Sequence, residues 1–162
     1  MRKVGIVMGS DSDLPVIEKT VRILRELDIP FEAHVYSAHR TPLEARDFAV
    51  SARDKGFGVI IAAAGMAAHL AGAIAANTTL PVIGIPCKGP ALDGMDALLS
   101  TVQMPSGIPV ATVGVNNGAN AALLAAQILA VEDAALADRL SARRAADTAK
   151  VLEKDAGIAA RL

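Results

Sequence analysis

Short apolar runs alternate with segments of helical periodicity along most of this chain. We assign five apolar runs to strands, at residues 4–8, 31–36, 59–63, 81–85 and 110–115. Four helices are expected between them, at residues 14–27, 42–55, 67–77 and 92–102. Strands that alternate with helices of this length indicate a parallel sheet joined by right-handed crossovers. The third run, Val59 to Ala63, is apolar at every position, which indicates a strand buried on both faces.

This alternation predicts a three-layer α/β fold with a flavodoxin-like, five-stranded parallel sheet in the order 2-1-3-4-5. In that order the ligand crevice lies beyond the carboxyl ends of strands 1 and 3, where the winding direction switches. We therefore expect the loops after the first three strands to meet there. The 162 residues are expected to form a single domain, with residues 119–162 as an alanine-rich helical extension that breaks near Glu132 and Asp133.

Composition and charge exclude several classes of function. A formal net charge of -1 and a pI near 6.3 provide no basic surface for nucleic acid and no cationic face for a membrane. No stretch approaches the roughly 18 uninterrupted apolar residues of a membrane span, so a cytoplasmic protein is expected. Cys87 is the only cysteine, which excludes an intrachain disulfide, and three histidines without helical pairing predict no metal site.

The first loop with chemical potential runs from Gly9 to Asp13. The hydroxyls of Ser10 and Ser12 and the free backbone N–H groups can hold a phosphate at the start of the following helix. Because a carboxylate repels a phosphate, Asp13 is assigned to a sugar hydroxyl and Asp11 is expected to face outward. The alternative is that Ser12 or Asp13 merely caps the helix.

The second loop, residues 37–42, combines an imidazole, a guanidinium and two hydroxyls. Histidine exchanges protons near neutral pH, and the arginine fork matches the geometry of a phosphate. His39 and Arg40 therefore predict proton transfer beside an anion clamp. Thr41 is also expected to cap the next helix, in a capping box with Glu44.

The third loop, residues 64–69, consists mainly of small residues, which let a flat ligand approach the backbone closely. Its histidine, His69, has two open interpretations: a group that faces the ligand, or a structural histidine satisfied within the fold. His34, inside the second strand, is assigned to packing or to the surface.

Three motifs, in this order, closely resemble those of the bacterial 5-(carboxyamino)imidazole ribonucleotide mutases, the PurE family, class I. They are Gly9-Ser10-Asp11-Ser12-Asp13, Ser37-Ala38-His39-Arg40-Thr41-Pro42 and Gly65-Met66-Ala67-Ala68-His69-Leu70. The likeness continues through residues 103–110 and 120–125, so it spans nearly the whole chain. It implies a cofactor-free isomerase of de novo purine biosynthesis, which moves a carboxylate from the exocyclic nitrogen of its ribonucleotide to ring carbon 4.

The resemblance also implies a role for each matching residue. His39 would be the general acid/base, and Asp13 would bind the ribose hydroxyls. The phosphate or its surroundings would be held by Ser10, Ser12, Ser37 and Arg40. The aminoimidazole would lie against the backbone around Ala63, Ala64 and Gly65, and His69 is counted among the substrate-binding residues. The family further implies a homo-octamer packed through its C-terminal helices, with no metal and no cofactor.

The chain departs from the family pattern at three positions. Ala63 and Met66 stand where glycine is frequent, and Ala71 stands where proline is common. These positions touch the loop that would line the aminoimidazole, so they bear on substrate fit and loop rigidity and leave the phosphate assignments unchanged.

Two other functions remain open from the sequence. The nearest is an aminoimidazole ribonucleotide carboxylase, which would use free carbon dioxide on the same fold, although the Ala67-Ala68-His69-Leu70 segment favours the mutase. The other is a non-catalytic nucleotide-binding module of flavodoxin-like type, which would bind the ribonucleotide without converting it.

Overall fold

The computed structural model describes all 162 residues, and its centre is a five-stranded sheet. The strands are β1 (Lys3–Met8), β2 (Phe31–Val35), β3 (Phe57–Ala64), β4 (Val82–Pro86) and β5 (Ala111–Thr112). Their order is β2-β1-β3-β4-β5, and every neighbouring pair is parallel. The predicted fold and strand order are therefore confirmed.

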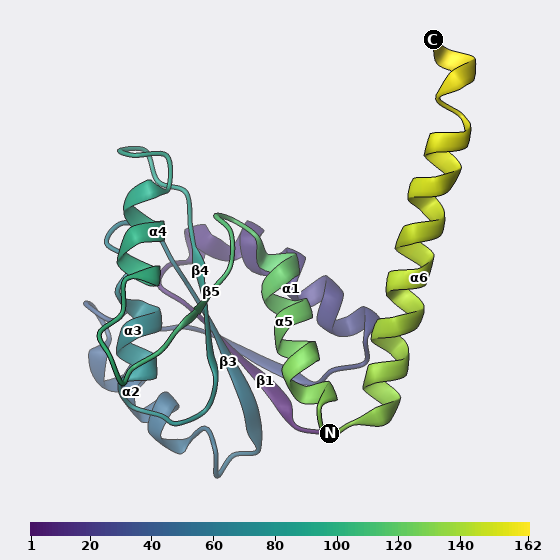
Figure 1. Ribbon diagram of the computed structural model, residues 1–162. Coiled ribbons are helices and arrows are strands. Elements are labelled where there is room, and N and C mark those ends of the chain that lie inside the picture. The colour runs from purple at the N-terminus through teal and green to yellow at the C-terminus, as the bar shows by residue number, and fades with distance from the viewer.

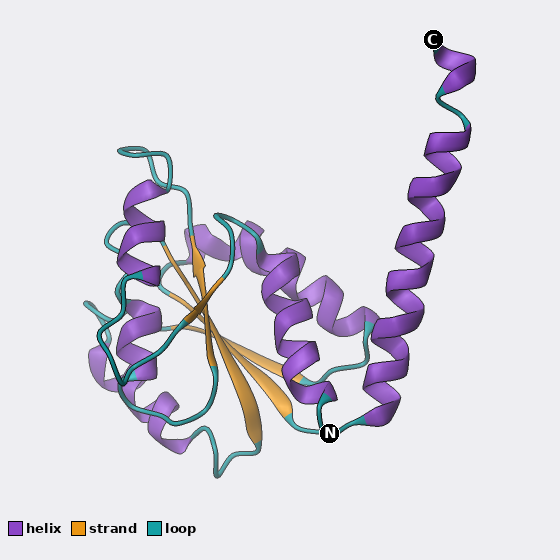
Figure 2. Ribbon diagram, in the orientation of Figure 1, coloured by secondary structure: helices purple, strands orange, loops and turns teal.

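Helices cover both faces of this sheet (Figures 1 and 2). One face carries α1 (Leu14–Glu26) and α5 (Gly118–Ala130), and the other carries α2 (Pro42–Ser51), α3 (Leu70–Ala75) and α4 (Met95–Val102). Successive residues of β3 alternate between two hydrophobic clusters, with Val59 and Ile61 in one and Ile60 and Ala62 in the other. This alternation confirms the prediction that the third strand is buried on both faces.

The C-terminal helix α6 (Ala134–Ala156) extends away from the sheet, so the C-terminus lies far from the α/β layers (Figure 1). It begins where a break was predicted, because the side chain of Asp133 caps it by accepting from the Leu136 N–H at 3.0 Å. Near its start, Arg139 Nε donates to the carbonyl oxygen of Leu27 at 3.1 Å, and Arg143 pairs with Glu26. No helix of the chain combines the length and apolarity needed to cross a membrane.

Several predicted elements are longer than the observed ones. Helix α2 ends at Ser51, four residues early, and a turn closes at Gly56 with a φ of +82°. Helix α4 begins only after Gly94, whose φ is +95°. Strand β5 has only two residues, and the turn that leads from it into α5 includes Asn116, with a φ of +55°.

Candidate functional site

The carboxyl ends of β2, β1 and β3 bring three loops together. Because β1 lies between the other two strands, the loop that follows it has a neighbour on each side. Tyr36 N–H donates to the carbonyl oxygen of Met8 at 3.0 Å, and Gly9 N–H donates to that of Ala63 at 3.0 Å. The predicted convergence of the three loops at the switch point is therefore observed.

The loop after β2 is held by hydrogen bonds between its own residues. The hydroxyl of Thr41 accepts from Ser37 N–H at 2.8 Å and donates back to the Ser37 carbonyl oxygen at 3.3 Å. The hydroxyl of Ser37 in turn accepts from the N–H groups of His39, at 3.3 Å, and Arg40, at 3.2 Å. These bonds fix the backbone from which the imidazole and the guanidinium project.

The predicted capping box is wrong. Thr41 does occupy the N-cap position of α2, but its side chain makes no capping hydrogen bond to the helix. The hydroxyl is already committed to Ser37, four residues earlier, and the backbone N–H of Thr41 donates to the Ser37 carbonyl oxygen at 2.9 Å instead of to Glu44. The residue thus stabilises the loop that precedes the helix.

Arg40 connects the second loop to the first. Its Nη2 atom donates to the carbonyl oxygen of Gly9 at 2.8 Å, while the side chain remains exposed. A guanidinium has five N–H donors, so one bond to a carbonyl leaves several for an anion. The cation is therefore held at the boundary between the loops with capacity to bind a phosphate.

The loop after β1 forms a short 3-10 turn, Asp11–Asp13, before α1 begins. Ser10 caps this turn by accepting from Ser12 N–H at 3.3 Å, and Asp11 is exposed, as expected. Asp13 stands at the N-cap of α1 without a side-chain capping bond, so the simple capping interpretation of Ser12 and Asp13 is not what the structure shows. Asp13 is instead buried, and burial is the main cause that raises the pKa of its carboxyl group.

Two histidines meet between the second and third loops. His39 Nε2 lies 2.9 Å from His69 Nδ1, and the rings meet edge to face with centroids 5.0 Å apart. Both side chains are exposed, so His69 is not a histidine packed within the core. His34 lies apart from this pair, partly buried and stacked on Tyr36 at 5.0 Å, in agreement with its assignment to packing or to the surface.

The backbone of the third loop offers one position with free polar groups. The carbonyl oxygen of Ala63 accepts from Gly9, and that of Ala64 accepts from Cys87 N–H at 2.8 Å. Gly65 takes part in no backbone hydrogen bond. Of the three positions predicted to line a flat ring, Gly65 is thus the one whose N–H and C=O groups are available.

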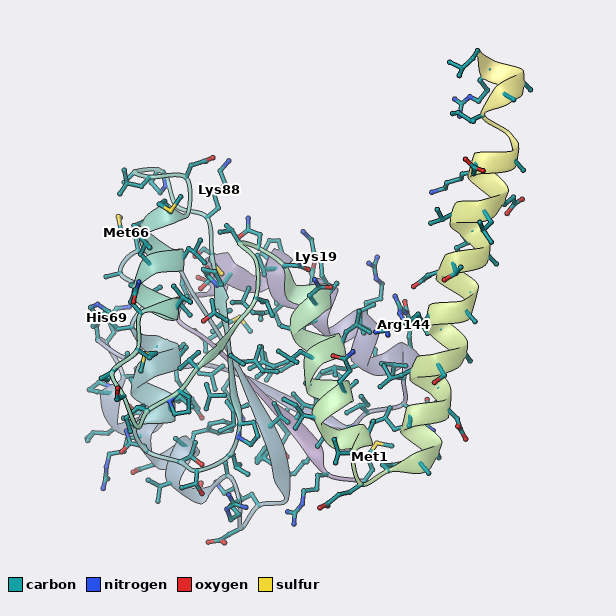
Figure 3. All side chains as sticks on the ribbon, viewed as in Figure 1. Met1, Lys19, Met66, His69, Lys88 and Arg144 are labelled. Carbon is teal, nitrogen blue, oxygen red and sulfur yellow. The ribbon has the colours of Figure 1, made fainter.

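A fourth loop, residues 88–94 after β4, adjoins the site and was missed by sequence reasoning. A Cβ on Gly89 would lie 3.8 Å from the Cβ of Met66, which places the two loops in contact. Met66, His69 and Lys88 lie on the same side of the molecule, away from Arg144 on α6 (Figure 3). The predicted strand order could have identified this loop. Because β4 lies next to β3 in the sheet, the loop after β4 emerges beside the third loop.

Cys87 directly follows β4 and is buried beneath these loops. Burial raises the pKa of its thiol to about 12, and the neighbouring Asp13 carboxylate contributes to that rise. The thiol therefore stays protonated near neutral pH and unreactive as a nucleophile. No group of three or more histidine, cysteine or acidic side chains is placed to hold a metal ion.

Comparison with known proteins identifies the family. The model of the family described as AIR carboxylase matches residues 3–150. This chain belongs to the AIR carboxylase family. An AIR carboxylase family relative from Pyrococcus horikoshii, an N5-carboxyaminoimidazole ribonucleotide mutase, is 57% identical over 137 residues, which cover 85% of this chain and 77% of the relative.

Further AIR carboxylase family relatives differ in length and name. The phosphoribosylaminoimidazole carboxylase of Candida albicans is 58% identical over 130 residues, which cover 80% of this chain but only 23% of that protein. The crystal structure of Treponema denticola PurE superposes with a TM-score of 0.81 at 30% identity, covering 94% of this chain and 96% of the other. The fold is thus shared over nearly the full length of a solved relative.

The three departures from the AIR carboxylase family pattern have different structural consequences. Ala63 and Ala71 are buried, one in each hydrophobic cluster, so their side chains pack within the fold. Met66 is 63% exposed and lies beside Gly89 in the fourth loop. Only the Met66 side chain is therefore exposed at the site.

Proposed function

We propose that this protein is an N5-carboxyaminoimidazole ribonucleotide mutase in which His39 is the general acid/base. Mutase relatives align over most of their length, including one from Thermotoga maritima that is 49% identical over 90% of its chain. The observation that carries the proposed mechanism is the placement of His39. It projects from a loop fixed by Ser37, next to an arginine that bridges to the neighbouring loop.

The reaction needs one proton to be given and then recovered. Protonation of the exocyclic nitrogen lets its bond to the carboxylate break, which releases carbon dioxide within the site. Ring carbon 4 then forms a bond to that carbon dioxide, and the proton on carbon 4 must be removed. A single histidine can perform both transfers, and a positioned acid/base of this kind contributes roughly 10²- to 10⁴-fold in rate.

The binding roles proposed for the other residues fit their surroundings. Ser37 accepts two N–H donors with its hydroxyl oxygen, so the hydroxyl proton remains available for a phosphate oxygen. Arg40 supplies the positive charge, and Ser10 and Ser12 supply hydroxyls from the adjacent loop. Asp13, set back in the same loop, is proposed to accept from the ribose hydroxyls.

The backbone of the third loop is proposed to contact the aminoimidazole. Gly65 has free backbone groups for the ring, while Ala63 and Ala64 shape the floor beneath it. His69 is proposed to lie close to the reacting part of the substrate, because its ring touches that of His39.

The AIR carboxylase alternative differs in its source of carbon dioxide. The fungal carboxylase name belongs to a protein of which this chain covers only 23%, so that name does not favour the alternative. The purified protein should convert 5-(carboxyamino)imidazole ribonucleotide directly. Efficient turnover of aminoimidazole ribonucleotide with low bicarbonate, and no ATP-dependent carboxylating partner, would instead identify a carboxylase.

We also propose a homo-octamer in the cytoplasm. A closed octamer of dihedral symmetry needs at least two different interfaces, and two separate elements expose apolar side chains. Met95, Leu99 and Val102 share one face of α4, while Val151 and Leu152 project from α6. The single free thiol, Cys87, suits a reducing compartment.

The variant His39→Asn tests the proposed mechanism. It removes the ionisable group while keeping a polar side chain on an exposed position, so the fold should be retained. We expect conversion to fall by roughly 10²- to 10⁴-fold while calorimetry still detects binding of the product ribonucleotide. His34→Asn, outside the site, is the matched control and should keep full activity. Unchanged conversion in His39→Asn would overturn the mechanism, and binding without conversion by the unmodified protein would favour the non-catalytic module.

A further inference from the structure

Two of the three histidines of this chain form a hydrogen-bonded pair that joins two loops. His39 Nε2 and His69 Nδ1 are 2.9 Å apart, with the ring planes at 78° to one another. The residues are thirty positions apart in the sequence, and the strand order β2-β1-β3 places their loops on either side of the loop that follows β1. The contact is therefore a product of the fold and not of local sequence.

Each imidazole projects from a backbone that is held in place. The N–H of His39 donates to the Ser37 hydroxyl at 3.3 Å. The N–H of His69 donates to the carbonyl oxygen of Ala67 at 2.9 Å, and the flanking Ala68 and Leu70 are buried. Anchored backbones on both sides give the pair a defined geometry in spite of its exposure.

A hydrogen bond between two imidazole nitrogens requires one nitrogen to be protonated and the other to be bare. If His39 Nε2 is the donor, the second nitrogen of His39, Nδ1, is free to exchange a proton with a ligand. If His69 Nδ1 is the donor, a neutral His39 already holds its proton on Nδ1 and cannot act there as a base. Neither His39 Nδ1 nor His69 Nε2 makes a hydrogen bond within the protein.

We infer that His69 is a positioning residue that accepts the Nε2 proton of His39, so that His39 performs its proton transfers through Nδ1. This inference rests on the proposed function, since only a reaction that uses His39 as acid and then as base needs this arrangement. It assigns to His69 the neutral tautomer with its own proton on Nε2.

The proton balance follows from that assignment. Cationic His39 gives its Nδ1 proton to the exocyclic nitrogen as the bond to the carboxylate breaks and carbon dioxide leaves. After ring carbon 4 has bonded to the carbon dioxide, His39 Nδ1 removes the proton from carbon 4 and the ring regains its aromatic electrons. The Nε2 proton stays on His39 and is donated to His69 throughout, and this hydrogen bond is stronger while His39 is cationic.

The tautomers can be read directly by NMR of the full protein carrying ¹⁵N only at its histidines. Three histidines give at most six ring-nitrogen signals, and His34, remote from the pair, is an internal reference. In the neutral pair we expect protonated Nε2 on both His39 and His69, with a bare Nδ1 on His69 that is coupled to His39 Nε2. A protonated Nδ1 on neutral His69, or a bare Nε2 on neutral His39, would overturn the inference.

Two substitutions separate positioning from substrate binding. His69→Phe keeps an aromatic ring without an acceptor, whereas His69→Asn keeps an acceptor oxygen close to the position of Nδ1. We expect His69→Phe to lower kcat roughly 10- to 100-fold with little change in KM, because a hydrogen bond to a charged group is lost. His69→Asn should recover most of kcat, and His34→Phe should leave both parameters unchanged.

The outcomes distinguish this inference from the proposed function. A raised KM with normal kcat in both His69 variants, or equal loss of kcat in both, would overturn the positioning role while the mutase assignment stands. Full activity of His39→Asn would overturn the proposed acid/base role of His39, and failure of the unmodified protein to convert the ribonucleotide would overturn the mutase assignment. Normal kcat in His69→Phe beside an inactive His39→Asn would show that His39 works without His69.

Discussion

The loops at the carboxyl end of the sheet and the C-terminal helix α6 are both largely exposed, but different interactions hold them. In the loops, directional hydrogen bonds connect residues on neighbouring segments, such as the 2.8 Å bond from Arg40 to Gly9. In α6, 23 residues contribute only one buried side chain, that of Leu136. Hydrogen bonds between neighbouring loops fix the positions of the loops relative to one another. A helix pairs its own backbone N–H and C=O groups internally, so it keeps its form with few contacts to the rest of the fold.

This difference suits two different tasks. Proton transfer requires reacting atoms to be placed within hydrogen-bond reach, so the loops gain from many short, specific contacts. A surface for association requires accessible apolar area, which α6 offers through Val151 and Leu152 at 64% and 62% exposure. Similar exposure in the two regions thus corresponds to fixed geometry in one and to available surface in the other.

The largest effect is expected at Leu136, the one buried side chain of α6. Leu136→Ala removes its one buried residue, so we expect docking of α6 on the rest of the fold to weaken by about 2–5 kcal/mol. Faster hydrogen exchange of the first turns of α6, with a lower Tm at a fixed protein concentration, would measure this loss. Binding of the ribonucleotide at the distant loops should be unchanged.

The matched control for Leu136 is Val131, which precedes α6 and is 84% exposed. Val131→Ala should change stability by less than about 0.5 kcal/mol, as for most surface substitutions. Equal effects of the two variants would show that Leu136 does not anchor the helix.

The next largest effect is expected at the boundary between the first two loops. Arg40→Ala removes the bond to the Gly9 carbonyl oxygen and the cation proposed to hold the phosphate. Because hydrogen bonds to charged groups contribute about 1.5–3 kcal/mol, we expect KM and the product Kd to rise roughly 10- to 100-fold. Arg46→Ala, which removes an exposed arginine paired only with adjacent Asp47, should bind normally; a matching loss there would contradict a specific role for Arg40.

The sequence predicted the sheet better than the contacts between loops. Apolar runs such as Val59 to Ala63 identify strands because burial on both faces demands them, and the alternation of strands and helices limits the possible orders. The convergence of Gly9, Ser37 and Gly65 near one another followed from that order. The functional assignment needed the motif resemblance in addition, since fold alone does not determine chemistry.

The errors occurred where several local partners compete. Thr41 and Glu44 satisfy the pattern of a capping box, but the Thr41 hydroxyl bonds to Ser37 instead, and no spacing rule ranks these two partners. The bond between His39 and His69 depends on the shapes of two irregular loops. Sequence periodicity describes regular elements only, so side-chain contacts of this kind required the structure.

The smallest effect provides the sharpest test of the comparison, because each region contains a threonine that donates to a carbonyl oxygen four residues earlier. Thr41 donates to Ser37 at 3.3 Å in the second loop, and Thr148 donates to Arg144 at 3.0 Å within α6. Valine keeps the shape of threonine but removes the hydroxyl.

In Thr41→Val the Ser37 N–H also loses its acceptor, so we expect stability to fall by about 1 kcal/mol and kcat/KM by roughly fivefold as the loop loosens. In Thr148→Val the backbone stays paired within the helix, and both quantities should remain unchanged. Thermal denaturation and steady-state kinetics on the two variants measure the contrast, and indistinguishable results would mean that the hydrogen bonds of the loop do not set the geometry of the site.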